Sequence, residues 1–455
     1  MLTDLSHLLY PLPPDVQRLF EAGDLARMER VIALRLDAPG VPEPLKKRLR
    51  FQLDIARELP RAYPHTRDAL LAELKSRVSG FTEDELEALR DDGTLDWRYI
   101  GGEVRFKDNA ISNLFKTRAE YAARAVDPAV RENARQNSER LCDVIAQMKR
   151  QGGMRVRFTL REEMTVKSDL LTPGETLRIH LPLPVVGAQV KHVALLTTSH
   201  AARFIAPEDE PHRTVCFELP YEPGMTISAD LAYEIDAPYR QPRPEDVLPE
   251  QPPFDTQELP PHVVFTPYLR AVAREIIGDE TNALTKARKI YDFITTQGVY
   301  RFMPPYLTVT NIPEHFLSGL RGDCGVQALT FITLCRLAGI PAQWQAGLYT
   351  TPVSVGNHDW ARFYVAPYGW LYADCSYGGG AYRAGDLDRW NFYFGNLEPW
   401  RLPLCSAFQQ EFNPPRRFLR RDPYDNQNGE VETLSRALDR GEYDTDANVL
   451  SYEVL

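Results

Sequence analysis

The first 150 residues place apolar side chains with the period of amphipathic helices. Apolar positions recur at three- and four-residue spacing over 16–36 and 45–59, and Thr82 with Glu85 forms a capping box before another apolar run. A glycine pair at 101–102 separates two short runs and predicts a hairpin. The pattern therefore predicts a mainly helical N-terminal domain over residues 1–150, whose charged residues are distributed like helix surfaces.

From residue 151 the period changes to two, which is typical of strands with one buried face. Pro-Gly pairs at 173–174 and 223–224 supply turns between the alternating runs. The runs are 155–160, 177–181, 215–219 and 227–235. They predict a small β-sandwich over residues 151–236. Within it, His180 is expected to be a satisfied or solvent-facing strand histidine rather than a ligand.

The remaining pattern divides into three parts. Residues 237–262 are rich in proline and predict a linker lying over a surface, since proline removes backbone donors and stiffens the chain. Residues 263–420 alternate helix-like and strand-like runs and predict a compact α+β core. Residues 421–455 are acidic and weakly apolar, and we expect a tail that wraps the surface or is partly disordered. The whole is a multidomain α+β protein.

Composition narrows the possible partners. The chain has 455 residues, more than one core usually fills, and a net charge of −10. It lacks the basic surface that nucleic acid requires, and the short run of Arg416, Arg417, Arg420 and Arg421 is expected to be a solvated face. No signal-peptide pattern or membrane-length apolar stretch is present, so we expect a cytoplasmic location and no membrane partner. The six cysteines form no CxxC pair, which favours reduced thiols without a metal or cofactor.

Cys324 is the first candidate for chemistry. It follows Gly322-Asp323 and is expected to open a helix that ends near Gly339. A thiol at a helix N-terminus faces the positive end of the helix dipole, which is expected to lower its pKa and favour the nucleophilic thiolate. Backbone N–H groups there can also hold an oxyanion.

A thiolate mechanism needs a proton acceptor and a group that orients it. Among nine histidines, His358 alone lies just before an alternating strand with an aromatic neighbour. Asp374 closes the next strand, and an antiparallel pair joined by a turn at 367–369 would bring it beside His358. Asp359 is a weaker rival, because adjacent strand residues point to opposite faces.

These residues resemble a known family. The motifs are Gly-Asp-Cys324-Gly-Val-Gln-Ala, Gly-Ile-Pro-Ala342, His358-Asp-Trp360 and Gly-Trp-Leu-Tyr-Ala-Asp374. In this order they are similar to the core of transglutaminase-like proteins, including bacterial members, over about residues 265–405. The resemblance implies a papain/transglutaminase-like fold, with Cys324 as nucleophile, His358 as general acid/base and Asp374 as its orienter, acting on a peptide or protein substrate.

The chain departs from the animal transglutaminases in two respects. It has no tryptophan between Trp97 and Cys324 to stabilise an oxyanion, and no evident calcium-binding acidic loop. Besides the backbone N–H of Cys324, the possible oxyanion donors are Asn311, Gln297 and Tyr300. Both departures favour hydrolysis of a peptide or isopeptide amide, through a thioester intermediate, over cross-linking.

Three alternatives stay open. The thioester could pass to an amine, giving protein-glutamine amine transfer. The fold could serve as a non-enzymatic binding scaffold, although an intact triad argues against this. A glycan-processing enzyme would rest on the β-sandwich and on aromatic residues such as Trp390, Tyr393 and Trp400, which are more often packing residues, and no paired acids single out a glycosidase.

Overall fold

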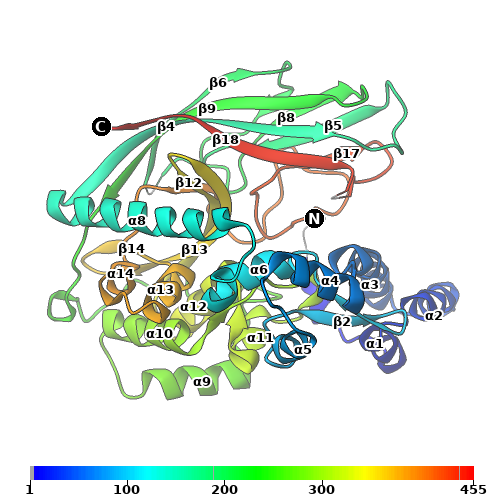
Figure 1. Ribbon diagram of the computed structural model, residues 1–455, viewed down its shortest axis with the longest axis horizontal. Coiled ribbons are helices and arrows are strands. Elements are labelled where there is room, and N and C mark those ends of the chain that lie inside the picture. The colour runs from blue at the N-terminus through cyan, green and yellow to red at the C-terminus, as the bar shows by residue number, and fades with distance from the viewer. Residues whose placement is uncertain (1–4, 188, 440) are drawn as a thin grey trace.

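A computed structural model describes residues 5–187, 189–439 and 441–455. Figure 1 shows the β-sandwich above, the central α+β core below it and most of the N-terminal helices to one side. The multidomain α+β prediction is confirmed. None of the helices in the described residues is both long and apolar enough to cross a membrane.

The N-terminal region is helical, with a small sheet of order β1-β3-β2. Its elements are η1 (Ser6–Leu9), α1 (Pro14–Glu21), α2 (Leu25–Asp37), α3 (Glu43–Ala62), β1 (His65–Thr66), α4 (Arg67–Arg77), α5 (Glu83–Asp91), β2 (Trp97–Ile100), β3 (Glu103–Phe106), α6 (Ala110–Thr117), α7 (Ala119–Ala122) and α8 (Pro128–Gln151). The predicted capping box and hairpin are both present. Gly23 divides the first amphipathic run: its φ is +70°, and a Cβ there would lie 1.9 Å from Tyr99 O.

The sandwich packs two four-stranded sheets, of order β17-β5-β8-β7 and β18-β4-β9-β6. Its strands are β4 (Gly153–Val166), β5 (Thr176–Pro182), β6 (Val190–Thr198), β7 (Phe204–Ile205), β8 (Thr214–Pro220), β9 (Thr226–Pro238), β17 (Glu430–Thr433) and β18 (Tyr443–Val454). Alternate residues of β4 and β9 are buried, as the period of two predicts. Residues 164–166 and 227–231 contribute to the cluster between the sheets, whereas 154–160 and 233–235 pack in the cluster shared with the core.

The expectation of a surface tail after residue 421 is wrong. β17 and β18 each add a strand to one sheet of the sandwich. The acidic composition concealed these strands. In β18 the carboxylates pair with cations in β4 or next to its end: Arg157 lies 3.1 Å from Glu453, and Lys167 Nζ lies 2.6 Å from Asp444.

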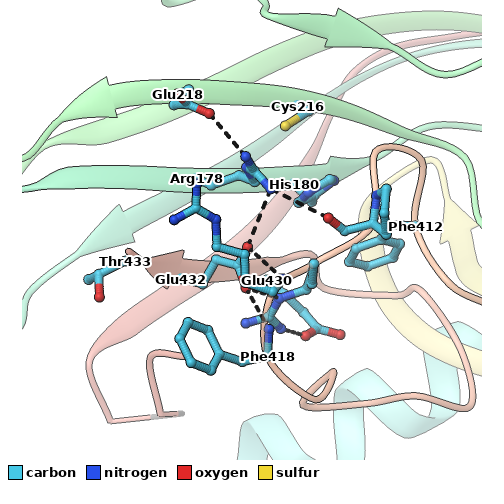
Figure 2. Close-up of polar contacts among 12 residues, drawn as sticks. Arg178, His180, Cys216, Glu218, Phe412, Phe418, Glu430, Glu432 and Thr433 are labelled. Atoms are coloured by element: carbon cyan, nitrogen blue, oxygen red, sulfur yellow. Dashed lines mark hydrogen bonds and ion pairs between the residues drawn. The ribbon is translucent and has the colours of Figure 1, made fainter. Parts of the chain in front are cut away.

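The basic run is not a solvated face either. Arg416 and Arg420 are 3% and 1% exposed, and both pair with Glu430 of β17. Glu432, fully buried, accepts a further bond from Arg416 Nε at 3.3 Å. Figure 2 shows these carboxylates between the sheet and the 412–418 segment. Arg416 and Arg420 can be buried because β17, a strand that the sequence analysis did not predict, supplies carboxylates that pair with them.

His180 lies in the same cluster (Figure 2). It is fully buried, its Nδ1 lies 2.9 Å from Thr214 Oγ1, and its ring stacks on Phe412. Burial, together with nearby arginines, lowers its pKa well below the usual value. The residue is therefore a neutral packing histidine rather than a solvent-facing one.

The core is an antiparallel sheet of order β15-β14-β13-β12-β16 packed on the buried helix α12. Its elements are η2 (Pro244–Asp246), α9 (Pro267–Ile277), α10 (Ala283–Gln297), β10 (Val299–Tyr300), η3 (Tyr306–Thr308), α11 (Ile312–Gly319), β11 (Arg321–Gly322), α12 (Cys324–Leu337), β12 (Ala342–Thr351), β13 (Ser354–Val365), β14 (Gly369–Ala373), α13 (Cys375–Arg383), α14 (Leu387–Phe392), β15 (Phe394–Gly395) and β16 (Arg401–Cys405). β13 begins earlier than predicted, so His358 lies within the strand.

Candidate active site

Cys324 is the first residue of α12 and remains partly exposed. Asp323 caps the helix, since its Oδ1 accepts bonds from Val326 N at 3.1 Å and from the Tyr306 hydroxyl at 2.5 Å. Gly325 leaves room for this arrangement: a Cβ there would lie 2.3 Å from the Tyr306 hydroxyl and 2.7 Å from Asp359 Oδ2. The local sequence therefore packs the thiol tightly against two acidic side chains.

The thiol of Cys324 donates a hydrogen bond to Asp359 Oδ2 at 3.4 Å. Burial, followed by the carboxylates of Asp359 and Asp323, raises the pKa of Cys324 well above its usual value. The expectation that the helix N-terminus lowers this pKa is therefore wrong in this structure. Desolvation and two nearby carboxylates outweigh the helix dipole, which contributes only about 0.3–1 kcal/mol at exposed sites.

His358 and Asp374 form the predicted pair. His358 Nε2 donates to Asp374 Oδ2 at 2.7 Å, and Asp374 also caps α13 by accepting from Tyr377 N at 3.0 Å. Burial lowers the pKa of His358 despite the opposing carboxylate of Asp374, so the imidazole is neutral near pH 7.

Arg401 extends this pair into a buried chain. Its Nη2 donates to Asp374 Oδ2 at 2.8 Å, and its Nη1 donates to Glu398. Burial opposes ionisation of Asp374, but His358 and Arg401 together lower its pKa below the usual range. The carboxylate therefore stays ionised and holds the imidazole with Nε2 protonated, which leaves Nδ1 as the nitrogen able to accept a proton.

The thiol and the imidazole have different partners. His358 and Asp359 are adjacent on β13 and project to opposite faces. Within the part of the chain that the structure describes, no hydrogen bond joins Cys324 to His358. Asp359, considered only as a rival orienter of the imidazole, instead accepts the bond from the thiol. Burial and the charge of Asp323 raise the pKa of Asp359 well above its usual value.

Of the three possible oxyanion donors, Tyr300 alone lies beside the thiol. Cys324 is among the neighbours whose proximity, after burial, raises the pKa of Tyr300. Asn311 instead caps α11, where its Oδ1 accepts from Glu314 N at 3.0 Å. Gln297 lies at the end of α10 and donates to Thr296.

Besides Arg401, sequence reasoning missed two contributors to this site. Lys116, on α6 of the N-terminal domain, donates to the Tyr300 hydroxyl at 3.1 Å and acts to lower the pKa of Cys324. Gln427 donates to Asp359 Oδ1 at 2.6 Å and to the His358 carbonyl at 3.2 Å. No motif in the sequence around Lys116 or Gln427 marks either residue as part of the site, because each reaches the site from a distant segment.

Two other features bear on the chemistry. Tyr393 is fully buried and Trp400 is 4% exposed, so both are packing residues. Trp390 is partly buried and donates to Thr295 Oγ1 at 2.9 Å. Among the described residues, no group of three or more His, Cys, Asp or Glu side chains is placed to hold a metal ion.

Comparison with known proteins gives a family match over part of the chain. The model of the transglutaminase-like superfamily matches residues 270–375, a segment that contains Cys324, His358 and Asp374. No curated protein is significantly similar to the chain in sequence.

Several solved structures are similar at low sequence identity. One is a candidate cysteine protease from Cytophaga hutchinsonii, with 15% identity, coverage of 67% of this chain and 90% of that chain, and a TM-score of 0.39. Another is the periplasmic domain of TgpA from Pseudomonas aeruginosa, with 16% identity, coverage of 55% and 96%, and a TM-score of 0.28. The family match, together with the α+β core, identifies residues 270–375 of this chain as a transglutaminase-like superfamily domain.

Proposed function

We propose that the protein is a cysteine hydrolase that cleaves peptide or isopeptide amides through Cys324, His358 and Asp374. The observation that carries the proposal is the buried His358–Asp374 pair, held by Arg401, in a sheet packed on a helix that begins with a cysteine. A fixed neutral imidazole and a thiol at a helix N-terminus are the parts that acyl transfer through a thioester needs.

The proposed reaction has two stages. The thiolate of Cys324 attacks the amide carbonyl carbon, and the imidazolium of His358 then protonates the leaving amine as the C–N bond breaks. Water next attacks the thioester while His358 accepts its proton, which releases the acid and restores the thiol. The backbone N–H of Cys324 and the Tyr300 hydroxyl are the proposed donors to the oxyanion.

The proton of the thiol must pass to His358 Nδ1, because Nε2 is committed to Asp374. The bond from Cys324 to Asp359 therefore describes a resting arrangement in this proposal. The attacking state requires the thiol to leave Asp359 and to meet the imidazole, through a local shift of the α12 start or of β13. Substrate binding at Cys324 is the event proposed to displace it.

We favour water over an amine as the acceptor. The chain lacks both the upstream tryptophan and the calcium loop of the animal transglutaminases. Hydrolysis would release new termini from a peptide library, whereas amine transfer would attach an amine probe to glutamine substrates. Amine incorporation without any peptide cleavage would refute the hydrolase assignment.

One observation favours a second candidate, a non-enzymatic scaffold: the thiol bonds to Asp359 and its pKa is raised. A thiol-reactive probe separates the two candidates. Cys142 is also exposed and would react, so labelling is measured in a Cys142→Ser background. The hydrolase proposal expects Cys324→Ala to abolish labelling and His358→Ala to lower turnover about 10²–10⁴-fold. Equal labelling with and without Cys324 would support the scaffold.

A further inference from the structure

A small cavity lies between the β-sandwich and the β12–β13 hairpin. It has a volume of about 140 Å³ and is bounded by the β4–β18 pair on one side and by Leu348 and Val355 of the hairpin on the other. It shares the lining residues Asn357 and Gln427 with a second cavity of about 380 Å³, so the two adjoin. In Figure 1, β12 lies beneath the β4 and β18 strands.

Glu162 of β4 contributes a buried carboxyl to this cavity. It is 4% exposed and lies between the inward-facing, fully buried Leu160 and Met164. Among the described residues, none forms a hydrogen bond with its buried Oε1. An unpartnered buried carboxyl oxygen costs free energy, about 1–3 kcal/mol for an ordinary polar group and more for a charge. Burial accordingly raises the pKa of Glu162 well above its usual value.

The rest of the lining favours a cation. Glu163 and Asp446 add two acidic residues, while Asn357 and Gln427 carry amide oxygens able to accept hydrogen bonds. Of the described residues that line this cavity, none is Lys, Arg or His. A group with several N–H donors and a positive charge would satisfy these acceptors, and the volume admits an ammonium group.

The cavity is linked to Cys324 through Gln427 and Asp359. Val355, Asn357 and Asp359 alternate along β13 and therefore share one face, with about 7 Å between successive members. Gln427, which lines the cavity, donates to the carboxyl of Asp359 that accepts the bond from Cys324. A substrate bound across Cys324 can thus reach the cavity with a neighbouring residue.

We propose that this cavity binds a primary ammonium group of the substrate, with Glu162 as its carboxylate partner. The inference rests on the proposed function, since it assigns the substrate of the same site a positive group next to the cleaved amide. The ammonium is either a lysine side chain or a peptide N-terminus.

Direct binding to the full-length Cys324→Ala variant tests the proposal without any catalysis. Titration calorimetry uses two ammonium probes, Nα-acetyl-lysine methylamide for the side chain and glycine methylamide for the N-terminus. Their neutral counterparts are Nα-acetyl-norleucine methylamide and N-acetylglycine methylamide. We expect one ammonium probe to bind at least about tenfold more tightly than its neutral counterpart, and which one binds identifies the source of the ammonium.

Two variants in that background locate the contact. Glu162→Gln keeps the shape of the side chain and should weaken binding of the ammonium probe at least about tenfold. Glu222→Gln, in the exposed turn between β8 and β9 and outside the lining of both cavities, is the control and should change it less than about twofold. Equal affinity for ammonium and neutral probes would overturn the proposal, even if Glu162→Gln did not fold. Equal weakening by both variants would also overturn it. Neither result depends on whether the wild type cleaves peptides.

Discussion

Replacing Asp374 by asparagine tests the buried chain that fixes His358. Asp374 is fully buried, and its Oδ2 accepts from His358 Nε2 at 2.7 Å and from Arg401 Nη2 at 2.8 Å. Breaking a buried ion pair by removing one partner costs about 3–5 kcal/mol. Because Glu398 still pairs with Arg401 and asparagine still accepts one bond, we expect the lower end, about 3 kcal/mol.

Thermal unfolding followed by circular dichroism measures this loss. For a domain of this size, about 3 kcal/mol corresponds to roughly 6–12 °C in the melting temperature. Ser376→Ala is the matched control, because Ser376 is an uncharged donor whose single bond to the other oxygen of the Asp374 carboxylate is 3.2 Å long. It should cost about 1.5 kcal/mol, the lower end for a bond to a charged group. NMR titration of His358 should also move to lower pH in Asp374→Asn, because the carboxylate acts to raise that pKa.

The pH dependence has a definite sign. The folded pKa of Asp374 is lowered, so its contribution to stability is complete above the ordinary value of about 3.9 and is lost as pH falls towards the folded pKa. The difference in melting temperature between wild type and Asp374→Asn should therefore be constant above about pH 5 and shrink below about pH 4. Two results would refute the reasoning. One is an Asp374→Asn variant that melts within about 2 °C of wild type at pH 7; the other is an Asp374→Asn variant whose melting temperature is no lower than that of Ser376→Ala.

Three further predictions concern other parts of the molecule. Burial lowers the pKa of His262 to about 3, so its contribution to stability is lost as pH falls below about 6.5. His262→Phe should therefore reduce the slope of unfolding free energy against pH by about 1.4 kcal/mol per pH unit between pH 6 and 5. Denaturant titrations measure this slope, and an unchanged slope would contradict the prediction. A Cβ at Gly347 would lie 2.0 Å from Leu402 O, so Gly347→Ala should lower the unfolding free energy by at least about 1–3 kcal/mol. The control is Gly356→Ala on the paired strand, where a Cβ would meet open space, and it should lower the unfolding free energy by less than about 1 kcal/mol. Lys116 acts to lower the pKa of Cys324, so Lys116→Gln should slow iodoacetamide alkylation of Cys324 at pH 8 without changing the melting temperature; an equal or faster rate would contradict the assignment.

The errors of sequence analysis have a common cause. The strands β17 and β18 were missed because their residues read as an acidic tail, and their partners β5 and β4 lie more than 200 residues earlier in the chain. The burial of Arg416 and Arg420 was missed for the same reason, since Glu430 becomes their partner only when β17 joins the sheet. Local composition does not encode pairing at such separation.

Sequence by itself determined those elements, and the one pair of residues, that local geometry controls. The period of apolar positions predicted the helical region and the sandwich strands β4, β5, β8 and β9, because a buried face imposes its own repeat. Asp374 was predicted beside His358 because a short turn joins two antiparallel strands, and the structure has this contact at 2.7 Å. Residues 270–375 were also the part with a recognisable motif order.

Tertiary structure alone decided the environment of Cys324. The helix start predicted an acidic thiol, but burial and the carboxylates of Asp359 and Asp323 raise its pKa. Lys116 and Gln427 reach the site from the N-terminal domain and from the last 35 residues, and Glu162 borders the adjoining cavity from the sandwich. A pKa and a binding cavity depend on charges and surfaces that meet across the fold, whereas the period of a helix or strand is a property of neighbouring residues.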